Sequence, residues 1–308
     1  MNILIIGLGS IAKKHIYAIK TIFDDISIYA LRSSSLSRRY DGVIDIFSLR
    51  DLKIQPDFII ISNPTYLHEE TIFKALEFDC PLFIEKPVLN DTKNDQALIA
   101  LLEEKNVMTY VACNMRFHPS IVFLKNRITS VQPQINEVNI YCGSNLPDWR
   151  PGTDFRQSYS ANENMGGGVH LDLIHELDYC YWLFGKPLAV KSVKRSVSTL
   201  KIKSIDYANF TLTYAGFAAN IILNYYRIDP RRQIEVVLSD DTLTIDLLKN
   251  RVQSNISGEI LFEAPFSMSD TFENQIKYFV AQIRQKSEPE NNFKTGVEIL
   301  KIALNEQA

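Results

Sequence analysis

Cysteine is scarce in this sequence, and no cysteine stands close to another. Cys80, Cys113, Cys142 and Cys180 are scattered through 308 residues. A zinc knuckle or a redox pair needs two cysteines a few residues apart, so the sequence predicts neither, and we expect no metal site. Isolated cysteines of this kind are usually buried, reduced thiols, and we expect that of these four.

Long apolar runs and an excess of charge of one sign are also absent. The formal net charge is -3 and the pI is near 6.0, so the chain as a whole has no attraction to nucleic acid or to an anionic membrane. The first apolar run, residues 3–6, is too short for a signal-peptide core or a membrane span. We therefore expect a cytoplasmic protein with neither nucleic acid nor membrane as a partner.

The first 115 residues alternate short β-branched apolar runs with longer amphipathic stretches. This pattern is typical of a parallel sheet covered by helices. Its order predicts right-handed crossovers and a doubly wound α/β domain over residues 1–115. The predicted strands are 3–6, 27–31, 58–62, 82–84 and 108–112, and the predicted helices are about 11–22, 67–77 and 91–105.

From residue 116 onward, the sequence changes to longer runs that alternate with a period of two. Such runs predict an α+β domain over 116–308, with a large, mostly antiparallel sheet that is covered on one face only. We expect Val, Ile and Tyr on the open face, and therefore a homodimer or homotetramer through this sheet. The predicted strands are 137–141, 189–197, 207–214, 218–226 and 233–238. The predicted helices are 165–183 and two within about 270–308 that pack back toward the first domain.

A glycine-rich turn follows the first predicted strand and opens a helix. Gly7 and Gly9 supply the tight turn and the close backbone approach that a pyrophosphate requires, and Ala12 is small enough for the helix to pack on the strand. The helix N-terminus offers free N–H groups and a partial positive charge. We therefore predict dinucleotide binding by Gly7, Gly9, Ser10, Ile11 and Ala12, with an ordinary tight turn as the alternative.

The end of the second predicted strand bears on the choice between NAD and NADP. An acidic residue there would bind the ribose 2′-hydroxyl of NAD, but residues 29–31 run instead into Arg32, Ser33 and Ser34. A guanidinium with nearby hydroxyls suits a 2′-phosphate. The sequence therefore favours NADP over NAD, with a solvated basic loop as the alternative.

Further cofactor contacts are predicted where the next apolar run ends. Asn63 and Pro64 lie at the carboxyl edge of the predicted sheet, where the ligands of doubly wound folds bind. His68 opens the following helix and is included as a cofactor candidate. An ordinary turn is the alternative at this position.

Three more segments carry a resemblance to a known family. They are Ile84-Glu85-Lys86-Pro87 after a strand, Asn114-Met115-Arg116-Phe117 at the domain junction, and three glycines at 166–168 that lead into Asp172 and His175. With the opening turn, these segments make nearly the whole chain resemble the glucose-fructose oxidoreductase, inositol dehydrogenase and rhizopine-catabolism family, Gfo/Idh/MocA. The resemblance implies a Rossmann domain, a C-terminal open-faced sheet domain, and NAD(P)-dependent chemistry on sugars, cyclitols or their derivatives.

The resemblance also implies roles for individual residues. Lys86, Asp172 and His175 map to the active site, and Asp172 and His175 are three residues apart where the family usually has four. Either spacing would put both side chains on one face of a helix. Histidine titrates in the range that a general base needs, so His175 is the first candidate, while Lys86 would stabilise a developing alkoxide; which of the two accepts the proton stays open. Glu85 and Lys86 are also cofactor candidates, and the substrate candidates are Lys86, Asn114, Arg116, Asp172 and His175.

A polar segment in the second domain completes the candidate substrate residues. Arg150, Arg156 and Tyr159 lie within ten residues of one another, beside Trp149 and Asp154. Guanidinium and aromatic groups together suit a carboxylate, a phosphate or a nucleotide-linked sugar. An oligomer contact is an equal alternative.

These features predict an NADP- or NAD-dependent dehydrogenase or reductase of a sugar or sugar derivative, including nucleotide-linked or acidic sugars of surface-glycan biosynthesis. A binding protein that senses the cofactor without chemistry is one alternative. A lyase or hydrolase that uses the nicotinamide transiently is another.

Overall fold

The computed structural model describes residues 1–36 and 38–306. The chain divides into two compact units. The first unit contains Met1–Asn114 and Met268–Glu298, and the second contains Met115–Ser267 and the residues from Ile299 onward. The first unit is therefore built from two segments that are far apart in the sequence.

The first unit contains a six-stranded sheet in the order β3-β2-β1-β4-β5-β6. All neighbouring strands are parallel, which confirms the predicted doubly wound sheet. β1 and β4 read as continuous apolar runs because helices cover both faces of a sheet of this kind. The strands are β1 Asn2–Ile6, β2 Ser27–Leu31, β3 Ile44–Ile46, β4 Phe58–Ile61, β5 Leu82–Ile84 and β6 Thr109–Val111.

The helices of the first unit come from both of its segments. Helix α7 packs beside α1, and its residue Phe279 lies with its ring centroid 5.4 Å from Phe58 and 5.5 Å from Phe83. These edge-to-face contacts bury an aromatic cluster against the sheet. The helices are α1 Ser10–Ile22, α2 His68–Ala75, α3 Asp95–Glu104, α7 Met268–Gln285 and the start of α8 Phe293–Leu304.

The second unit contains an eight-stranded sheet in the order β14-β13-β12-β11-β7-β10-β9-β8. The pair β7 and β10 is parallel and the other pairs are antiparallel, which confirms the predicted mostly antiparallel sheet. The strands are β7 Ile135–Asn145, β8 Ala189–Arg195, β9 Tyr207–Thr213, β10 Ala218–Asn224, β11 Tyr226–Leu238, β12 Thr242–Asp246, β13 Arg251–Ser254 and β14 Ile260–Glu263.

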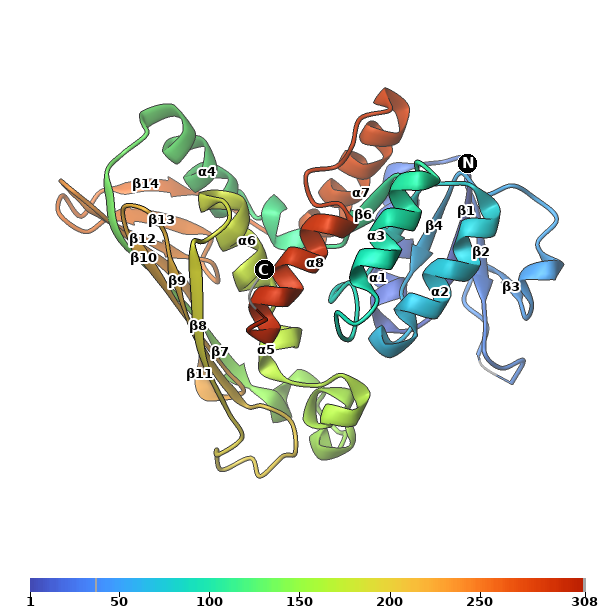
Figure 1. The fold of residues 1–308 in the computed structure, drawn as a ribbon, viewed down its shortest axis with the longest axis horizontal. Coiled ribbons are helices and arrows are strands. Elements are labelled where there is room, and N and C mark those ends of the chain that lie inside the picture. Colours follow the sequence, from blue (N-terminus) through green and yellow to red (C-terminus); the bar gives the residue numbers. More distant parts are fainter. Residues whose placement is uncertain (37, 307–308) are drawn as a thin grey trace. The chain divides into compact units, whose positions relative to one another are not determined.

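Helices α4 Pro119–Val131, α5 Val169–Asp172 and α6 His175–Phe184 lie on one face of this sheet (Figure 1). The opposite face carries a row of side chains from four neighbouring strands. Thr211 donates to Asn220 at 3.1 Å, Asn220 to Asn139 at 3.4 Å, and Asn139 to Glu235 at 3.1 Å. The expectation that Val, Ile and Tyr make up this face is therefore wrong for this row, which is polar.

The helix expected over residues 165–183 is also wrong, because the chain is interrupted there. The 3-10 turn Glu163–Met165 ends at Gly166, which has a φ of 81°. Helix α5 then begins after Gly168, whose φ of 142° also requires glycine. Leu173 and Ile174 separate α5 from α6.

Among the described residues, no helix has both the length and the apolar character to cross a bilayer. All four cysteines are buried and free, as predicted. Burial raises the pKa of the Cys80 and Cys180 thiols to about 12, so these thiols stay protonated.

Candidate active site

The turn between β1 and α1 contains Gly7 and Gly9. The space beside Gly9 is open, whereas the space beside Gly7 is filled by a neighbouring residue. Gly7 has a φ of 94°, and a Cβ there would lie 2.5 Å from the backbone nitrogen of Asn63. At Gly9, a Cβ would meet no atom of the described residues within 4 Å. Gly9 is the N-cap of α1, and within residues 1–36 and 38–306 no side chain caps this helix end. The N-terminal N–H groups of α1 thus lie below an open space, and a dinucleotide pyrophosphate fits this cradle.

The residues after β4 lie beside this turn, because β4 pairs directly with β1. Ser62 donates to the backbone oxygen of Gly7 at 2.8 Å. Asn63 donates to Thr71 of α2 at 2.7 Å. Pro64 begins the short turn that leads into α2. The predicted cofactor residues Asn63 and Pro64 are therefore next to the glycine turn.

The ring of His68 lies between two backbone carbonyl groups. Its ring is buried, with Nδ1 at 3.2 Å from the backbone oxygen of Val88 and Nε2 at 3.0 Å from that of Asn63. Burial lowers the pKa of His68, so the ring is neutral at neutral pH and donates one of these hydrogen bonds. The side chain connects the loops after β4 and β5.

The Glu85-Lys86-Pro87 segment is anchored to α1. Glu85 lies 2.5 Å from Nε2 of His15 through Oε1, and its Oε2 accepts the backbone N–H of Lys86 at 3.2 Å. His15 is fully buried. These contacts place Lys86 immediately after β5, at the same sheet edge as the glycine turn.

Arg32 follows β2, and its guanidinium forms an ion pair with an acidic residue. Nη1 of Arg32 lies 2.6 Å from Oδ1 of Asp45 on β3, and Nη2 donates to the backbone oxygen of Arg38 at 3.2 Å. The exposed fractions of the Arg32 and Asp45 side chains are 8% and 13%. Ser33 is exposed and Ser34 is half-buried. A carboxylate of the neighbouring strand β3 therefore lies beside the end of β2.

In the second unit, Asp172 ends α5 and His175 begins α6. The two residues do not share one continuous helix, contrary to the expectation from their spacing. The hydroxyl of Tyr225 donates to Oδ2 of Asp172 at 2.5 Å, and both residues are buried. His175 is half-buried.

Two buried ion pairs hold the first turn of α6. Arg232 of β11 lies 2.6 Å from Glu176, while Arg116 binds Asp178 through two hydrogen bonds of 2.9 and 2.7 Å. The exposed fraction of the Arg116 side chain is 5%. The guanidinium predicted to bind substrate is thus engaged in a bidentate pair within the fold.

Asn114, the last residue of the first unit's long segment, is likewise engaged within the fold. It is buried and donates to Thr271 of α7 at 2.7 Å. This contact ties the end of the segment to α7.

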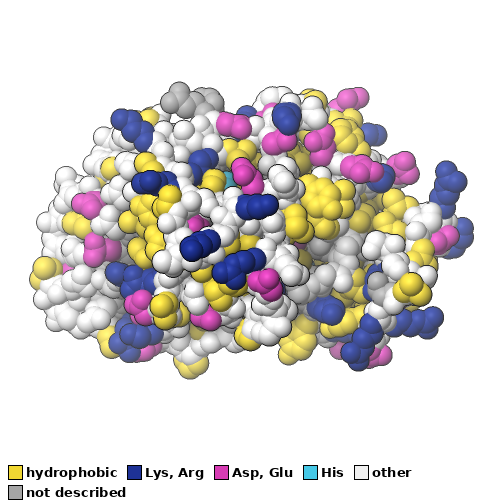
Figure 2. Space-filling model, turned by 90° about the horizontal axis from the view of Figure 1, so that it is seen from below, with side chains coloured by type: hydrophobic (Ala, Val, Ile, Leu, Met, Phe, Trp, Pro, Cys, Tyr) yellow, Lys and Arg dark blue, Asp and Glu magenta, His cyan; other side chains and the backbone are white. Residues whose placement is uncertain are grey.

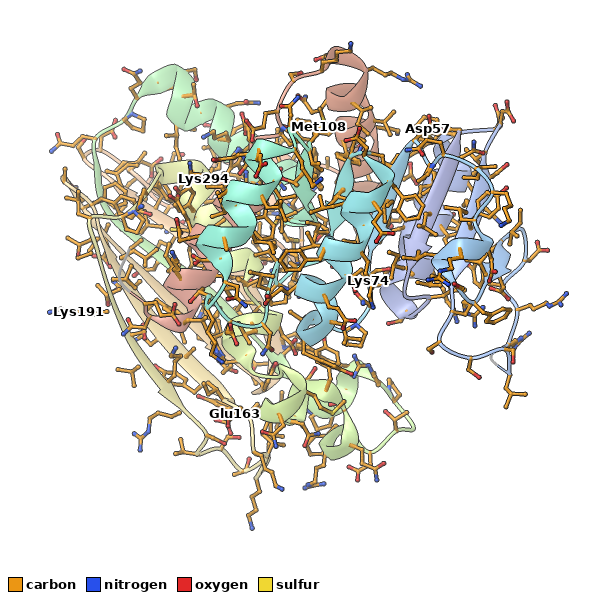
Figure 3. All side chains as sticks on the ribbon, turned by 45° about the vertical axis from the view of Figure 1, so that its right-hand side comes forward. Asp57, Lys74, Met108, Glu163, Lys191 and Lys294 are labelled. Carbon is orange, nitrogen blue, oxygen red and sulfur yellow. The ribbon has the colours of Figure 1, made fainter. Side chains whose placement is uncertain are left out.

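The three candidates of the polar segment are at the surface. Arg150 stacks over Tyr159, with its Cζ 5.2 Å from the ring centroid, and Arg156 stacks over Phe155 at 4.5 Å. Tyr159 is 40% exposed as a whole, but its hydroxyl end is buried near Asp172, and this burial and the charge of Asp172 raise its pKa. These residues precede the turn that contains Glu163, which is labelled in Figure 3.

Asp45, Glu176 and Tyr225 are among the residues of these sites that escaped prediction from the sequence. Asp45 lies in a strand of three residues, which is too short for a periodic signal. Glu176 follows His175 directly, but only the structure pairs it with Arg232. Tyr225 continues the inward positions of β10, so alternation predicts burial but not its partner 53 residues away.

Comparison with known proteins agrees with this geometry. Residues 1–113 match the oxidoreductase family with an NAD-binding Rossmann fold. Residues 134–244 match the GFO/IDH/MocA C-terminal domain. The chain belongs to the Gfo/Idh/MocA family. The predicted resemblance to this family is therefore confirmed.

Two curated members of the family illustrate the similarity. The uncharacterized oxidoreductase YrbE of Bacillus subtilis is 26% identical over 71% of this chain and 65% of its own length. The NADP-dependent scyllo-inositol 2-dehydrogenase IolW of the same organism is 24% identical over 62% of this chain and 53% of its own length. The chain thus spans less than two thirds of either relative.

Solved structures of the Gfo/Idh/MocA family match nearly the whole chain. UDP-N-acetylglucosamine 3-dehydrogenase GnnA from Acidithiobacillus ferrooxidans has a TM-score of 0.79 at 21% identity, covering 99% of this chain and 96% of its own. WlbA dehydrogenase from Bordetella pertussis, in complex with NADH and UDP-GlcNAcA, has a TM-score of 0.81 at 15% identity, covering 99% and 95%. At such low identity, these matches establish the fold.

Proposed function

We propose that this protein transfers hydride between a nicotinamide dinucleotide and a hydroxyl-bearing carbon of a sugar or sugar derivative. The observation that carries the proposal lies within the first unit. The uncapped N-terminus of α1 beneath Gly9 and the Lys86 segment after β5 are at the same carboxyl edge of one sheet. A phosphate cradle and a cationic side chain at one sheet edge suit a dinucleotide enzyme rather than a passive turn.

The bound nicotinamide would supply or accept the hydride. The residues of this chain would bind, orient and move protons. Gly7, Gly9 and the first N–H groups of α1 would hold the pyrophosphate, with Asn63 and Pro64 beside it. We propose NADP as the preferred cofactor, with Arg32, Ser33 and Ser34 near the 2′-phosphate. The pairing of Arg32 with Asp45 weakens this preference, since a carboxylate there opposes a second anion.

Acid–base chemistry is assigned to His175 and Lys86. In the oxidation direction, the imidazole of His175 would take the proton of the reacting hydroxyl. Lys86 would stabilise negative charge that develops during the reaction. Asp172 would accept a hydrogen bond from a substrate hydroxyl or orient His175. In the reduction direction, His175 would return the proton to the same oxygen.

A nucleotide-linked or acidic sugar is the proposed substrate class. Arg150 and Arg156 are exposed cations that each lie over an aromatic ring. A planar guanidinium held over a ring is preorganised to bind a carboxylate or phosphate. WlbA, which has the same fold, was solved with a sugar of this class.

We further propose a homodimer or homotetramer through the uncovered face of the second unit's sheet. The hydrogen-bonded row from Thr211 to Glu235 crosses this face, and Lys191 is paired with Thr211 at the edge strand β8. Lys191 points outward from that strand (Figure 3). The row has Lys191 at one end and Glu235 at the other. Two copies related by a two-fold axis could therefore place these opposite charges against each other. Light scattering that shows only monomer would contradict this assembly.

The proposed activity is tested by mixing the protein with NADP or NAD and a panel of free, acidic and UDP-linked sugars. Appearance of the reduced-nicotinamide absorbance band with at least one sugar is the expected result. Tight cofactor binding with no turnover on any sugar, in either direction, would contradict the proposal and favour a cofactor-sensing protein.

A further inference from the structure

Tyr225 lies where β10 and β11 meet, and its surroundings fix it in place. The residue is fully buried. Its backbone N–H donates to Asp206 at 3.0 Å, and its backbone oxygen accepts from Leu146 at 2.7 Å. The ring of Trp149 packs edge-on against the phenol, at 5.3 Å between centroids and 89° between planes. Backbone and ring are therefore both held, so the hydroxyl oxygen has one position.

That hydroxyl meets the carboxylate of Asp172. The oxygen of Tyr225 lies 2.5 Å from Oδ2 of Asp172. This distance is within the range of charge-assisted O–H···O⁻ hydrogen bonds. Burial raises the pKa of Tyr225, and the charge of Asp172 raises it further, so the phenol remains protonated and must be the donor.

Asp172 needs such a fixed partner because of its place in the chain. It ends the four-residue helix α5, and Leu173 and Ile174 interrupt the helix before His175. A continuous helix would set the relative orientation of the two side chains through its backbone alone. Here the helix does not continue, so the orientation depends on side-chain contacts, and the one with Tyr225 comes from the sheet.

We propose that Tyr225 is a positioning residue that holds Asp172 as a hydrogen-bond acceptor and thereby leaves proton uptake to His175. The proposal rests on the proposed function of Asp172 and His175. The geometry of the two candidate catalytic residues would thus depend on Tyr225, a residue next to the sheet strands β10 and β11. A rigid phenol that donates its only proton to a carboxylate fixes the orientation of that carboxylate.

The test is a double-mutant cycle of Tyr225→Phe and Asp172→Asn, with NAD(P)H affinity measured in parallel. Losing a hydrogen bond to a charged group corresponds to about a 10- to 100-fold effect, so kcat of Tyr225→Phe should fall by about that factor. KM should change less, and cofactor affinity should stay unchanged. In the Asp172→Asn background, the same change should have little further effect, because the acceptor of the Tyr225 hydroxyl is already altered. Additive losses in the cycle would overturn the proposal.

Tyr214→Phe is the matched control. Tyr214 is also a buried tyrosine of the second unit, and its hydroxyl donates to the backbone oxygen of Gly185 at 3.3 Å rather than to Asp172. This variant should keep the wild-type kcat. An equal loss in Tyr214→Phe would show that any buried phenol matters for stability alone, and would also overturn the proposal.

A second measurement is independent of turnover. The hydroxyl proton of Tyr225 should give a downfield, slowly exchanging NMR signal that disappears in Tyr225→Phe and shifts in Asp172→Asn. Absence of this signal in the wild type would overturn the hydrogen bond itself. A wild type that shows the signal but turns over no sugar would contradict the proposed function and leave the hydrogen bond standing. A wild-type kcat in Tyr225→Phe, with the signal lost, would refute the positioning role.

Discussion

The guanidinium of Arg32 lies 2.6 Å from the carboxylate of Asp45, and both side chains are largely buried. The first residue follows β2 and the second belongs to β3, whose pairing with β2 brings them together. The positive charge expected to select NADP is therefore balanced before any cofactor binds. The preference for NADP or NAD would therefore depend on the charges of both Arg32 and Asp45, not on Arg32 alone.

Asp45→Asn should raise the affinity for NADPH by about tenfold and change the affinity for NADH little, because the variant removes one negative charge near the 2′-position. Fluorescence titration of reduced cofactors measures both constants without a substrate. Asp24→Asn, a site outside the strands and helices with the same change in charge, is the control. An unchanged NADPH to NADH ratio in Asp45→Asn would show that Arg32 does not face the 2′-phosphate.

Gly9→Ala and Gly7→Ala should fail in different ways. A Cβ at Gly9 meets nothing within 4 Å, so Gly9→Ala should keep the wild-type melting temperature while its methyl group enters the phosphate cradle. We expect cofactor affinity to fall by about tenfold or more. Gly7→Ala should lower the melting temperature, because its Cβ would collide with Asn63 and its φ is 94°. Wild-type cofactor affinity in Gly9→Ala would contradict the assigned cradle.

Lys86→Ala should reduce kcat by about a thousandfold while sparing cofactor binding, because it removes the cation that stabilises charge on the reacting oxygen. Steady-state kinetics and a binding titration on the same preparation measure both effects. Lys93→Ala is the control, since the exposed fraction of this neighbouring lysine is 82%. A similar loss of kcat in both variants would show that the effect comes from a disturbed loop and not from the missing Lys86 side chain.

Arg116→Ala should lower the free energy of unfolding by about 3–5 kcal/mol, because it leaves Asp178 buried without the guanidinium. Arg251→Ala provides a matched control, since Arg251 and Glu263 form a partly exposed pair in the same unit and should contribute at most about 1 kcal/mol. Thermal and denaturant unfolding compare the two. If Arg116→Ala kept wild-type stability and raised KM instead, Arg116 would be a substrate residue, as its place in the sequence predicted.

Stability should fall as the pH drops below about 6.5. Burial lowers the pKa of His118 and of His170 to about 4, from an unfolded value of 6.5. Between these values the unfolded chain binds protons that the folded chain does not. Each histidine therefore costs about 1.4 kcal/mol of stability per pH unit in this window, and nothing further above pH 6.5. Unfolding at pH 7 and pH 5 measures the loss, and His118→Gln should reduce it; an equal loss in the variant would exclude His118.

The β1-turn-α1 segment could be predicted because several local signals coincide there. An apolar strand, two glycines and an amphipathic helix follow one another without a gap, and each is visible within a few residues. β3 escaped prediction because a strand of three residues has no measurable period. Because β3 was not predicted, Asp45 and its ion pair with Arg32 were not predicted either.

The break between α5 and α6 could not be predicted because Leu173 and Ile174 continue the apolar pattern of a helix. The residues that hold the site there come from distant strands. Tyr225 and Arg232 reach Asp172 and Glu176 through the register of the large sheet, and register is a property of the whole sheet rather than of a local window. Basic, acidic and apolar side chains are interspersed over the face drawn in Figure 2, so its charge pattern does not single out a site either.

Transfer of deuterium from substrate to cofactor would distinguish hydride transfer from cofactor sensing and from lyase or hydrolase chemistry. Sugars that turn over in the absorbance assay would be prepared with deuterium on the reacting carbon and incubated with the protein and oxidised cofactor. If the protein transfers hydride, we expect one deuterium at C4 of the nicotinamide for each oxidised sugar formed. Product without deuterium in the cofactor, or deuterium returned to a dehydrated or hydrolysed product without net reduction, would contradict it.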